Sequence, residues 1–127
     1  MDPKMQERQI QFTISGADVR VTIDPELMEQ VLINLLLNAI EAVAEQNKPR
    51  IEIRIDSDPK GARIHITDNG EGMDEVTAEK IFVPFFTTRK SGSGIGLAIT
   101  KQILHLHHAE IQFQTEKGKG TEFIIQL

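Results

Sequence analysis

The sequence predicts an α+β fold: a two-layer sandwich in which a mixed, mostly antiparallel sheet packs on three helices. Two observations support this prediction. Short segments that alternate apolar and polar residues recur along the chain, which is the pattern of strands with one buried face. Between them lie stretches with helical periodicity, the longest from Pro25 to about Gln46. All 127 residues are expected to form a single domain around one core; residues 1–4 could be an expression remnant.

The strands are expected in three hairpins, each made of two alternating segments around a turn signal. The paired segments are residues 9–14 with 19–23, 51–55 with 62–67, and 111–115 with 121–127. Shorter helices are expected at residues 74–80 and 97–107. The apolar residues expected between sheet and helices are Ile51, Ile53, Ile55, Ile64, Ile66, Phe113, Phe123 and Ile125.

The long helix distributes its polar residues unevenly. Asp24 followed by Pro25 marks its start, because aspartate is a good N-cap and proline fits the first turn. Apolar side chains cover most of the circumference and leave one narrow polar strip, made of Asn34, Asn38, Glu41 and Glu45. The strip could simply face solvent. Two asparagines four residues apart in so apolar a helix indicate instead that they face a ligand.

Two glycine clusters bracket the segment that contains residues 82–90. The first, Asp68–Met73, follows a predicted strand, and its carboxylate suits an exocyclic amine better than a phosphate. The second, Gly92–Leu97, leads into a predicted helix, where unpaired N–H groups and the helix dipole suit phosphate. Between them, residues 82–91 lack a clear period and predict a mobile lid. Neither cluster has the spacing of the dinucleotide fingerprint or of a Walker A motif.

Composition excludes several classes of function. The net charge of −5 argues against nucleic acid as a partner, and a polyphosphate would need local positive charge, for which Arg89 and Lys90 are the candidates. No apolar run reaches the roughly 18 residues of a membrane helix, and no signal peptide opens the chain, so no direct membrane contact is expected. The absence of cysteine fits a reducing compartment.

Three motifs in order give the sequence a family resemblance. They are Asn34-Leu-Leu-Leu-Asn38-Ala39, then Asp68-x-Gly70-x-Gly72, then Phe82-x-Pro84-Phe85-Phe86 with Gly92-x-Gly94-x-Gly96-Leu97. This series resembles the N, G1, F and G2 boxes of the ATP-binding catalytic domain of sensor histidine kinases, in the superfamily shared by gyrase, Hsp90, histidine kinases and MutL. Gly118-x-Gly120-Thr121 looks like its last glycine box. The resemblance covers about residues 10–127 and implies the Bergerat fold with a short ATP lid.

The resemblance also implies roles for individual residues. Asn38 would be the protein ligand of Mg²⁺, Asp68 would accept a hydrogen bond from the adenine amine, and Thr121 would help orient Asp68. The remaining residues implied to lie around the nucleotide are Asn34, Gly70, Gly72, Met73, Ile81, Phe86, Thr87, Thr88, Arg89, Lys90, Gly92, Ser93, Gly94, Ile95, Gly96 and Leu97. Among these, Asn34, Arg89 and Lys90 would act with Asn38 in catalysis.

The sequence departs from the family pattern at two places. Many members carry Lys and Tyr three and four positions after the magnesium asparagine, where this chain has Glu41 and Ala42. Base affinity would then depend on aliphatic walls such as Ile66, Met73 and Ile81, a variant similar to the nitrogen-regulation and sporulation branch. At Asn34, the gyrase, Hsp90 and MutL members have a glutamate that activates water, and an amide cannot take that proton.

The expected function is therefore phosphoryl transfer rather than hydrolysis. The resemblance implies an ATP-dependent histidine kinase domain, cytoplasmic, that phosphorylates a histidine on a separate dimerisation domain absent from this sequence and acts on a response regulator only indirectly. His65, His105, His107 and His108 lack the residues that usually follow an acceptor and are expected to be surface or helix-end histidines. The alternatives are an anti-sigma-type serine kinase and a nucleotide-sensing module without chemistry.

Overall fold

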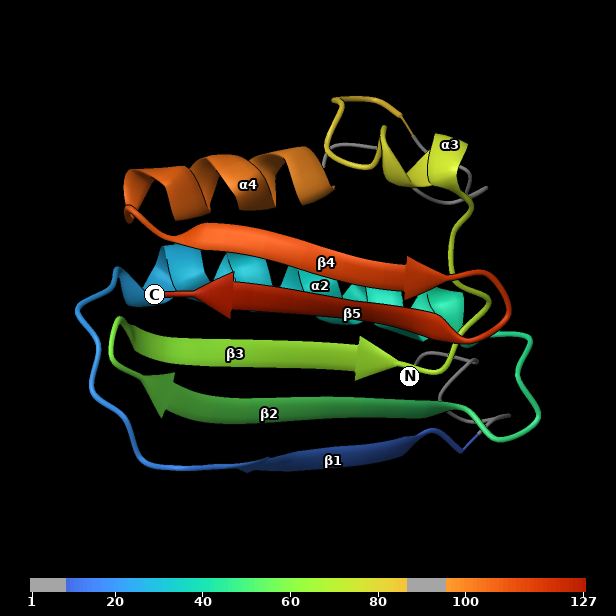
Figure 1. Ribbon diagram of the computed structural model, residues 1–127, viewed down its shortest axis with the longest axis horizontal. Coiled ribbons are helices and arrows are strands. Elements are labelled where there is room, and N and C mark those ends of the chain that lie inside the picture. Colours follow the sequence, from blue (N-terminus) through green and yellow to red (C-terminus); the bar gives the residue numbers. More distant parts are fainter. Residues whose placement is uncertain (1–8, 87–95) are drawn as a thin grey trace.

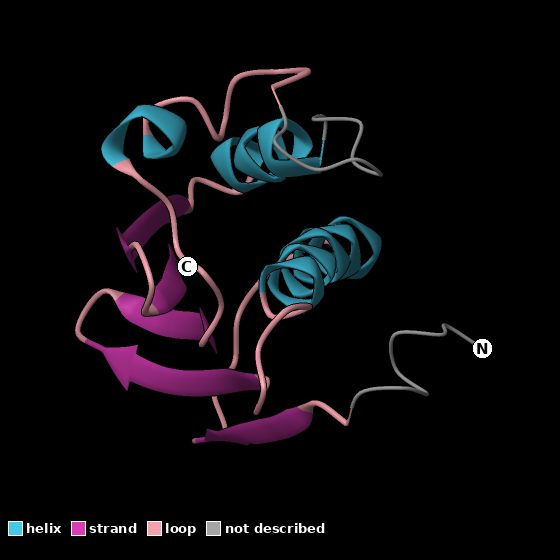
Figure 2. Ribbon diagram, turned by 90° about the vertical axis from the view of Figure 1, so that its right-hand side faces the viewer, coloured by secondary structure: helices cyan, strands magenta, loops and turns pink. Residues whose placement is uncertain are grey.

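The computed structural model describes residues 9–86 and 96–127 and confirms the two-layer α+β sandwich (Figure 1). The strands are β1 (Gln11–Gly16), β2 (Arg50–Asp58), β3 (Gly61–Asp68), β4 (Glu110–Glu116) and β5 (Gly120–Gln126), and the helices are α2 (Pro25–Ala42), α3 (Glu75–Ala78) and α4 (Gly96–Leu106). The strands form one sheet in the order β1-β2-β3-β5-β4. Figure 2 shows α2 and α4 side by side on one face of this sheet.

Two of the three predicted hairpins are confirmed and one is wrong. Strands β2 and β3 pair antiparallel, as do β4 and β5. Residues 19–23 form no strand, and β1 instead pairs in parallel with β2, with Phe12 opposite Ile51 and Ile14 opposite Ile53. An isolated hairpin is marginal in water, whereas pairing with β2 adds β1 to a sheet that already has a buried face. Strand β1 therefore pairs with β2, which is distant in sequence, and not with residues 19–23.

The core lies between the helices and the inward face of the sheet. On β3, every second side chain from Ala62 to Asp68 is buried, as the two-residue period of a strand requires. Of the eight expected core residues, Ile51, Ile53, Ile64, Ile66, Phe123 and Ile125 are buried, while Ile55 and Phe113 are half-buried. The sequence pattern thus identified the inward face correctly.

The predicted burial of the long helix is only partly confirmed. Met28, Val31, Leu35 and Ala39 are buried, but Ile33 and Leu37 are 42% and 54% exposed. The helix also ends at Ala42 rather than Gln46, since the following residues form turns. Its start is as predicted: Asp24 Oδ1 accepts hydrogen bonds from the backbone N–H groups of Glu26 and Leu27 at 3.0 and 3.1 Å.

Helix α3 is shorter than its predicted range and has its own cap. Asp74 Oδ1 accepts a hydrogen bond from the Thr77 backbone N–H at 2.8 Å. This bond, with a side-chain bond from Thr77, holds the pKa of Asp74 below its usual value. Helix α4 begins at Gly96 and ends at Leu106, one residue before each predicted boundary, within the usual uncertainty of helix ends.

Candidate active site

The strongest candidate site lies where β3 ends. The alternation along β3 brings Asp68 onto the inward face, where its side chain is only 6% exposed. A buried carboxylate needs hydrogen-bond donors, and Asp68 Oδ1 accepts one from the Gly70 backbone N–H at 2.8 Å. Asp68 also lies opposite Thr121 of β5 in the strand register. The structure thus places Thr121 beside Asp68, as the resemblance implies.

The loop after Asp68 packs against backbone on both sides. A Cβ added to Gly70 would lie 2.4 Å from the carbonyl oxygen of Ala42, and one added to Gly72, where φ is +69°, would lie 2.1 Å from that of Glu116. The Glu71 backbone N–H donates to the Ala42 carbonyl at 3.3 Å, and its carbonyl accepts from Gly118 at 2.6 Å. Packing within the protein therefore requires glycine at both positions. This requirement is separate from any close approach of the loop to a nucleotide base.

A threonine that the sequence did not single out holds the same loop. Thr115 Oγ1 accepts from the Met73 backbone N–H at 2.9 Å and lies 2.9 Å from Thr121 Oγ1. The predicted β4–β5 hairpin could have identified Thr115, because this pairing places it opposite Thr121. Thr115 thereby links the glycine loop to the strand beside Asp68.

Asn38 lies at the same end of the domain. It is buried, with 9% of its surface exposed, and it precedes Ala42 by one helical turn, about 6 Å along the axis. Ala42 is the residue whose carbonyl meets Gly70 and Glu71. Figure 1 shows the C-terminal end of α2 behind the sheet, at the same end of the domain as the tip of β3. The structure therefore brings Asn38 and Asp68, 30 residues apart in sequence, to one end of the sandwich.

Asn34 occupies a different position, between α2 and α4. Its Nδ2 donates to the Gly96 carbonyl at 3.1 Å and to Thr100 Oγ1 at 3.2 Å, and its Oδ1 accepts from Gln30 Nε2 at 2.9 Å. Thr100 is fully buried and was not singled out from the sequence. The sequence feature that could have identified Thr100 is its polarity, since the other residues in the first turn and a half of α4 are apolar or glycine.

Several of the expected site residues have less specific positions. Ile66 and Ile81 belong to the buried core, and Met73 and Leu97 are half-buried against it. Phe86 is half-buried, and its backbone N–H donates to Val83 at 3.2 Å. The predicted residues Thr87, Thr88, Arg89, Lys90, Gly92, Ser93, Gly94 and Ile95 lie outside the described residues.

The aromatic residues before this gap divide between two environments. Phe82 is half-buried, with its ring 5.9 Å from that of Phe113 and the Lys101 ammonium 4.9 Å from its centroid. Phe85 is 75% exposed at a positive φ of 70°. Phe82 therefore packs against the core, whereas the side chain of Phe85 is open to solvent.

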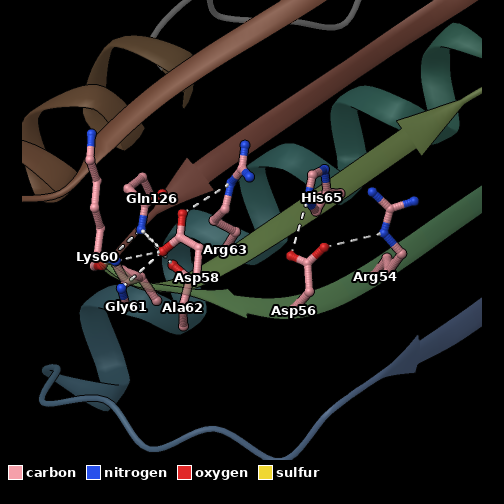
Figure 3. Close-up of polar contacts among 10 residues, drawn as sticks. Arg54, Asp56, Asp58, Lys60, Gly61, Ala62, Arg63, His65 and Gln126 are labelled. Carbon is pink, nitrogen blue, oxygen red and sulfur yellow. Dashed lines mark hydrogen bonds and ion pairs between the residues drawn. The ribbon is translucent and has the colours of Figure 1, made fainter.

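One histidine departs from the expected surface position. His65 is 6% exposed on the outward face of the sheet. Its Nε2 is 3.3 Å from Asp56 Oδ1, and Arg54 approaches the same aspartate at 3.7 Å (Figure 3). Its Nδ1 is 3.6 Å from Glu122 Oε2. The prediction was wrong because cross-strand neighbours on β2 and β5 cover this ring. His105 and His108 are exposed, as expected.

A cavity of about 520 Å³ lies at the opposite end of the domain from Asp68. It is lined by the segment Asp18–Ile23, the β2–β3 turn, His107 and Leu127. None of the residues assigned to the nucleotide lines it. No helix in residues 9–86 or 96–127 is long and apolar enough to cross a membrane.

The comparison with protein families agrees with this geometry. Residues 23–127 match the family described as histidine kinase-, DNA gyrase B- and HSP90-like ATPase, and the chain belongs to this family, as an ATP-binding domain of the sensor-kinase type.

Named relatives extend the comparison along the chain. The sensor histidine kinase ZraS of Escherichia coli (strain K12) is 35% identical over 99% of this chain, and AtoS of the same organism is 42% identical over 84%. The chain spans only 27% and 17% of the length of these two proteins. The nucleotide-free catalytic domain of histidine kinase ThkA has a TM-score of 0.83 and 33% identity, covering 98% of this chain and 83% of that one.

Proposed function

We propose that this domain binds ATP with Mg²⁺ and transfers the γ-phosphoryl group to a histidine on a separate helical dimerisation domain of the same kinase. The observation that carries the proposal is the pair of buried polar side chains at one end of the sandwich, the Asp68 carboxylate and the Asn38 amide, 6% and 9% exposed. Burying a polar group costs free energy unless the group is hydrogen-bonded, so two such side chains at one end of the core are consistent with a polar ligand site. In this family, the two positions correspond to opposite ends of the nucleotide.

Asp68 is proposed to recognise the adenine base. A carboxylate accepts several hydrogen bonds, so an exocyclic amine can join the one from the Gly70 N–H at 2.8 Å. Thr115 and Thr121 hold the strand ends around it, with their hydroxyls 2.9 Å apart. The aliphatic side chains of Ile66 and Met73 would border the base.

Asn38 is proposed to hold Mg²⁺ through its amide oxygen. In the described part of the chain, no three His, Cys, Asp or Glu side chains gather in a metal-binding arrangement. One neutral oxygen still fits Mg²⁺, which keeps several waters and takes the rest of its shell from substrate phosphates. The bound ion would neutralise phosphate charge. Thr88, Arg89 and Lys90 are proposed to supply further contacts to the phosphates, with Gly92, Gly94 and Gly96.

Transfer is favoured over hydrolysis because the position of the water-activating glutamate is held by Asn34. Its amide is hydrogen-bonded on both its nitrogen and its oxygen and cannot accept a proton at neutral pH. Phosphoryl transfer depends mainly on positioning and charge stabilisation. The acceptor histidine would come from the dimerisation domain, with a response regulator served indirectly, on the cytoplasmic side where ATP is the donor.

Phosphotransfer to a histidine-domain partner tests the proposal. The isolated domain is mixed with the histidine domain of the same kinase and γ-labelled ATP, and label is followed before and after acid treatment. Wild type should give acid-labile phosphoprotein, and Asn38→Ala should slow its formation about a hundredfold. Asn47→Ala is the matched control, since Asn47 is exposed beyond the end of α2.

Each other outcome has a defined meaning. Acid-stable label would support a serine kinase instead, and binding of ATP without transfer to any acceptor would support a nucleotide-sensing module. Equal rates for wild type and Asn38→Ala would remove Asn38 as the metal ligand.

A further inference from the structure

The amide of Asn34 bridges α2 and the first turn of α4 with hydrogen bonds on both its nitrogen and its oxygen. Its two N–H hydrogens go to the Gly96 carbonyl and to Thr100 Oγ1, at 3.1 and 3.2 Å, and its oxygen accepts from Gln30 at 2.9 Å. The three partners come from both helices, and Gly96 is the first residue of α4. The side chain therefore fixes the start of α4 against α2.

The chemistry of these partners selects an amide. Gly96 presents a carbonyl, which can only accept, so the side chain facing it must donate. A carboxylate at this position would put its oxygen against the Gly96 oxygen and leave the interaction repulsive. The Thr100 hydroxyl is fully buried, so the loss of its partner would leave a buried polar group unsatisfied. The asparagine is thus explained by a geometric requirement as well as by the missing base.

Beside this bridge and a hydrogen bond from the Asp24 backbone N–H to His107 Nε2 at the other end of the helix pair, α2 and α4 share buried apolar packing. Val31 and Leu35 of α2 and Ile103 and Leu104 of α4 are buried in the same core cluster. Apolar contacts are non-directional, whereas the two hydrogen bonds from the Asn34 amide to Gly96 and Thr100 have a defined distance and direction. Gly96 sits close enough that a Cβ there would lie 3.7 Å from Asn34 Cγ, so the first turn of α4 is held at van der Waals distance.

We infer that Asn34 and Thr100 are positioning residues, which hold the first turn of α4 at the place where its N–H groups meet the triphosphate. We call the two residues the α2–α4 clamp. This inference rests on the proposed function, because it concerns the phosphate end of the same ATP site. Among the described residues the Asn34 amide bonds to Gln30, Gly96 and Thr100, whereas Asp68 of the adenine end accepts from the Gly70 N–H and lies opposite Thr121 of β5.

Comparing the affinities for adenosine and ATP distinguishes effects at the adenine end of the site from effects at the phosphate end. Dissociation constants of both are measured for the isolated domain, ATP by calorimetry and adenosine by NMR shift titration, with the melting temperature recorded for each variant. Thr100→Val keeps the shape and removes the hydroxyl, and Asn34→Asp replaces the donor with an acceptor. Each should weaken ATP about tenfold and change adenosine affinity by less than about twofold.

Two controls make the comparison specific. Thr100→Ser keeps the oxygen and should restore ATP affinity to near that of wild type. Gln102→Ala, at an exposed position of the same helix, should bind both ligands as wild type does. If Asn34→Asp does not fold, Thr100→Val still gives the test.

The proposed role of the α2–α4 clamp is overturned if the affinities for ATP and adenosine fall in parallel in these variants, which would mean a general role in stability. It is also overturned if neither affinity falls. Failure of the wild-type domain to bind ATP would instead overturn the proposed function, and the clamp's effect on phosphate with it. The wild-type titration therefore distinguishes the two failures.

Discussion

The two ends of the sandwich are held together by different parts of the chain. At the Asp68 end, backbone meets backbone: the glycine loop lies against the Ala42 carbonyl, and the β4–β5 turn against the loop. At the opposite end, the side chain of His107, just after α4, bonds to the start of α2. His107 Nε2 accepts from the Asp24 backbone N–H at 3.0 Å, and its Nδ1 lies 2.9 Å from the Ile103 carbonyl, so Nδ1 carries the proton.

This difference separates a tightly packed end from an open one. The glycine loop has no room for a single added carbon, whereas the His107 end contains a cavity of about 520 Å³. Substitutions should therefore act on nucleotide binding at the first end and on stability alone at the second. A substitution at each end tests this contrast.

The largest effect is expected for Gly70→Ala. The added Cβ would lie 2.4 Å from the Ala42 carbonyl oxygen, so α2 or the loop must move. The free energy of unfolding should fall by about 2 kcal/mol and ATP binding should be lost, as measured by urea unfolding and calorimetry. The control is Gly118→Ala, where φ is +87° but no atom lies within 4 Å; it should cost only about 1 kcal/mol. Equal effects of the two substitutions would refute tight packing at the Asp68 end.

A smaller effect is expected for His107→Ala. The substitution removes the acceptor for the Asp24 N–H and the bond to Ile103, and should lower the free energy of unfolding by about 1 kcal/mol. ATP affinity should stay that of wild type, because the site lies at the other end of the helices. The exposed His105 of the same helix provides the control, and His105→Ala should leave stability unchanged. A loss of ATP affinity in His107→Ala would erase the contrast between the ends.

Much of this architecture could be predicted from the sequence, because it depends on local patterns. The alternation along residues 62–67 fixed the inward face and so the burial of Asp68, and the Asp24-Pro25 pair fixed the start of α2. The pairing of β1 could not be predicted in this way, since residues 9–14 and 19–23 carry a valid hairpin pattern and only the sheet decides the partner.

The motif residues of the candidate site could be named from the sequence, whereas the residues that pack around them could not. Asn38 and Asp68 stand in recognisable motifs, but Thr100 and Thr115 act through contacts between elements distant in sequence. The role of Asn34 was expected from its position in a motif, whereas its bonds to Gly96 and Thr100 depend on how α4 packs on α2. These contacts depend on tertiary packing, which leaves no local pattern in the sequence.

Titration with ATP and ITP measures whether Asp68 accepts a hydrogen bond from the adenine amine. ITP carries a carbonyl in place of the amine, so it would place an oxygen against the carboxylate. Wild type should bind ATP at least about tenfold more tightly than ITP, and Asp68→Asn, whose amide can donate, should bind the two with similar affinity. If wild type and Asp68→Asn prefer ATP over ITP by the same factor, Asp68 does not bind the amine.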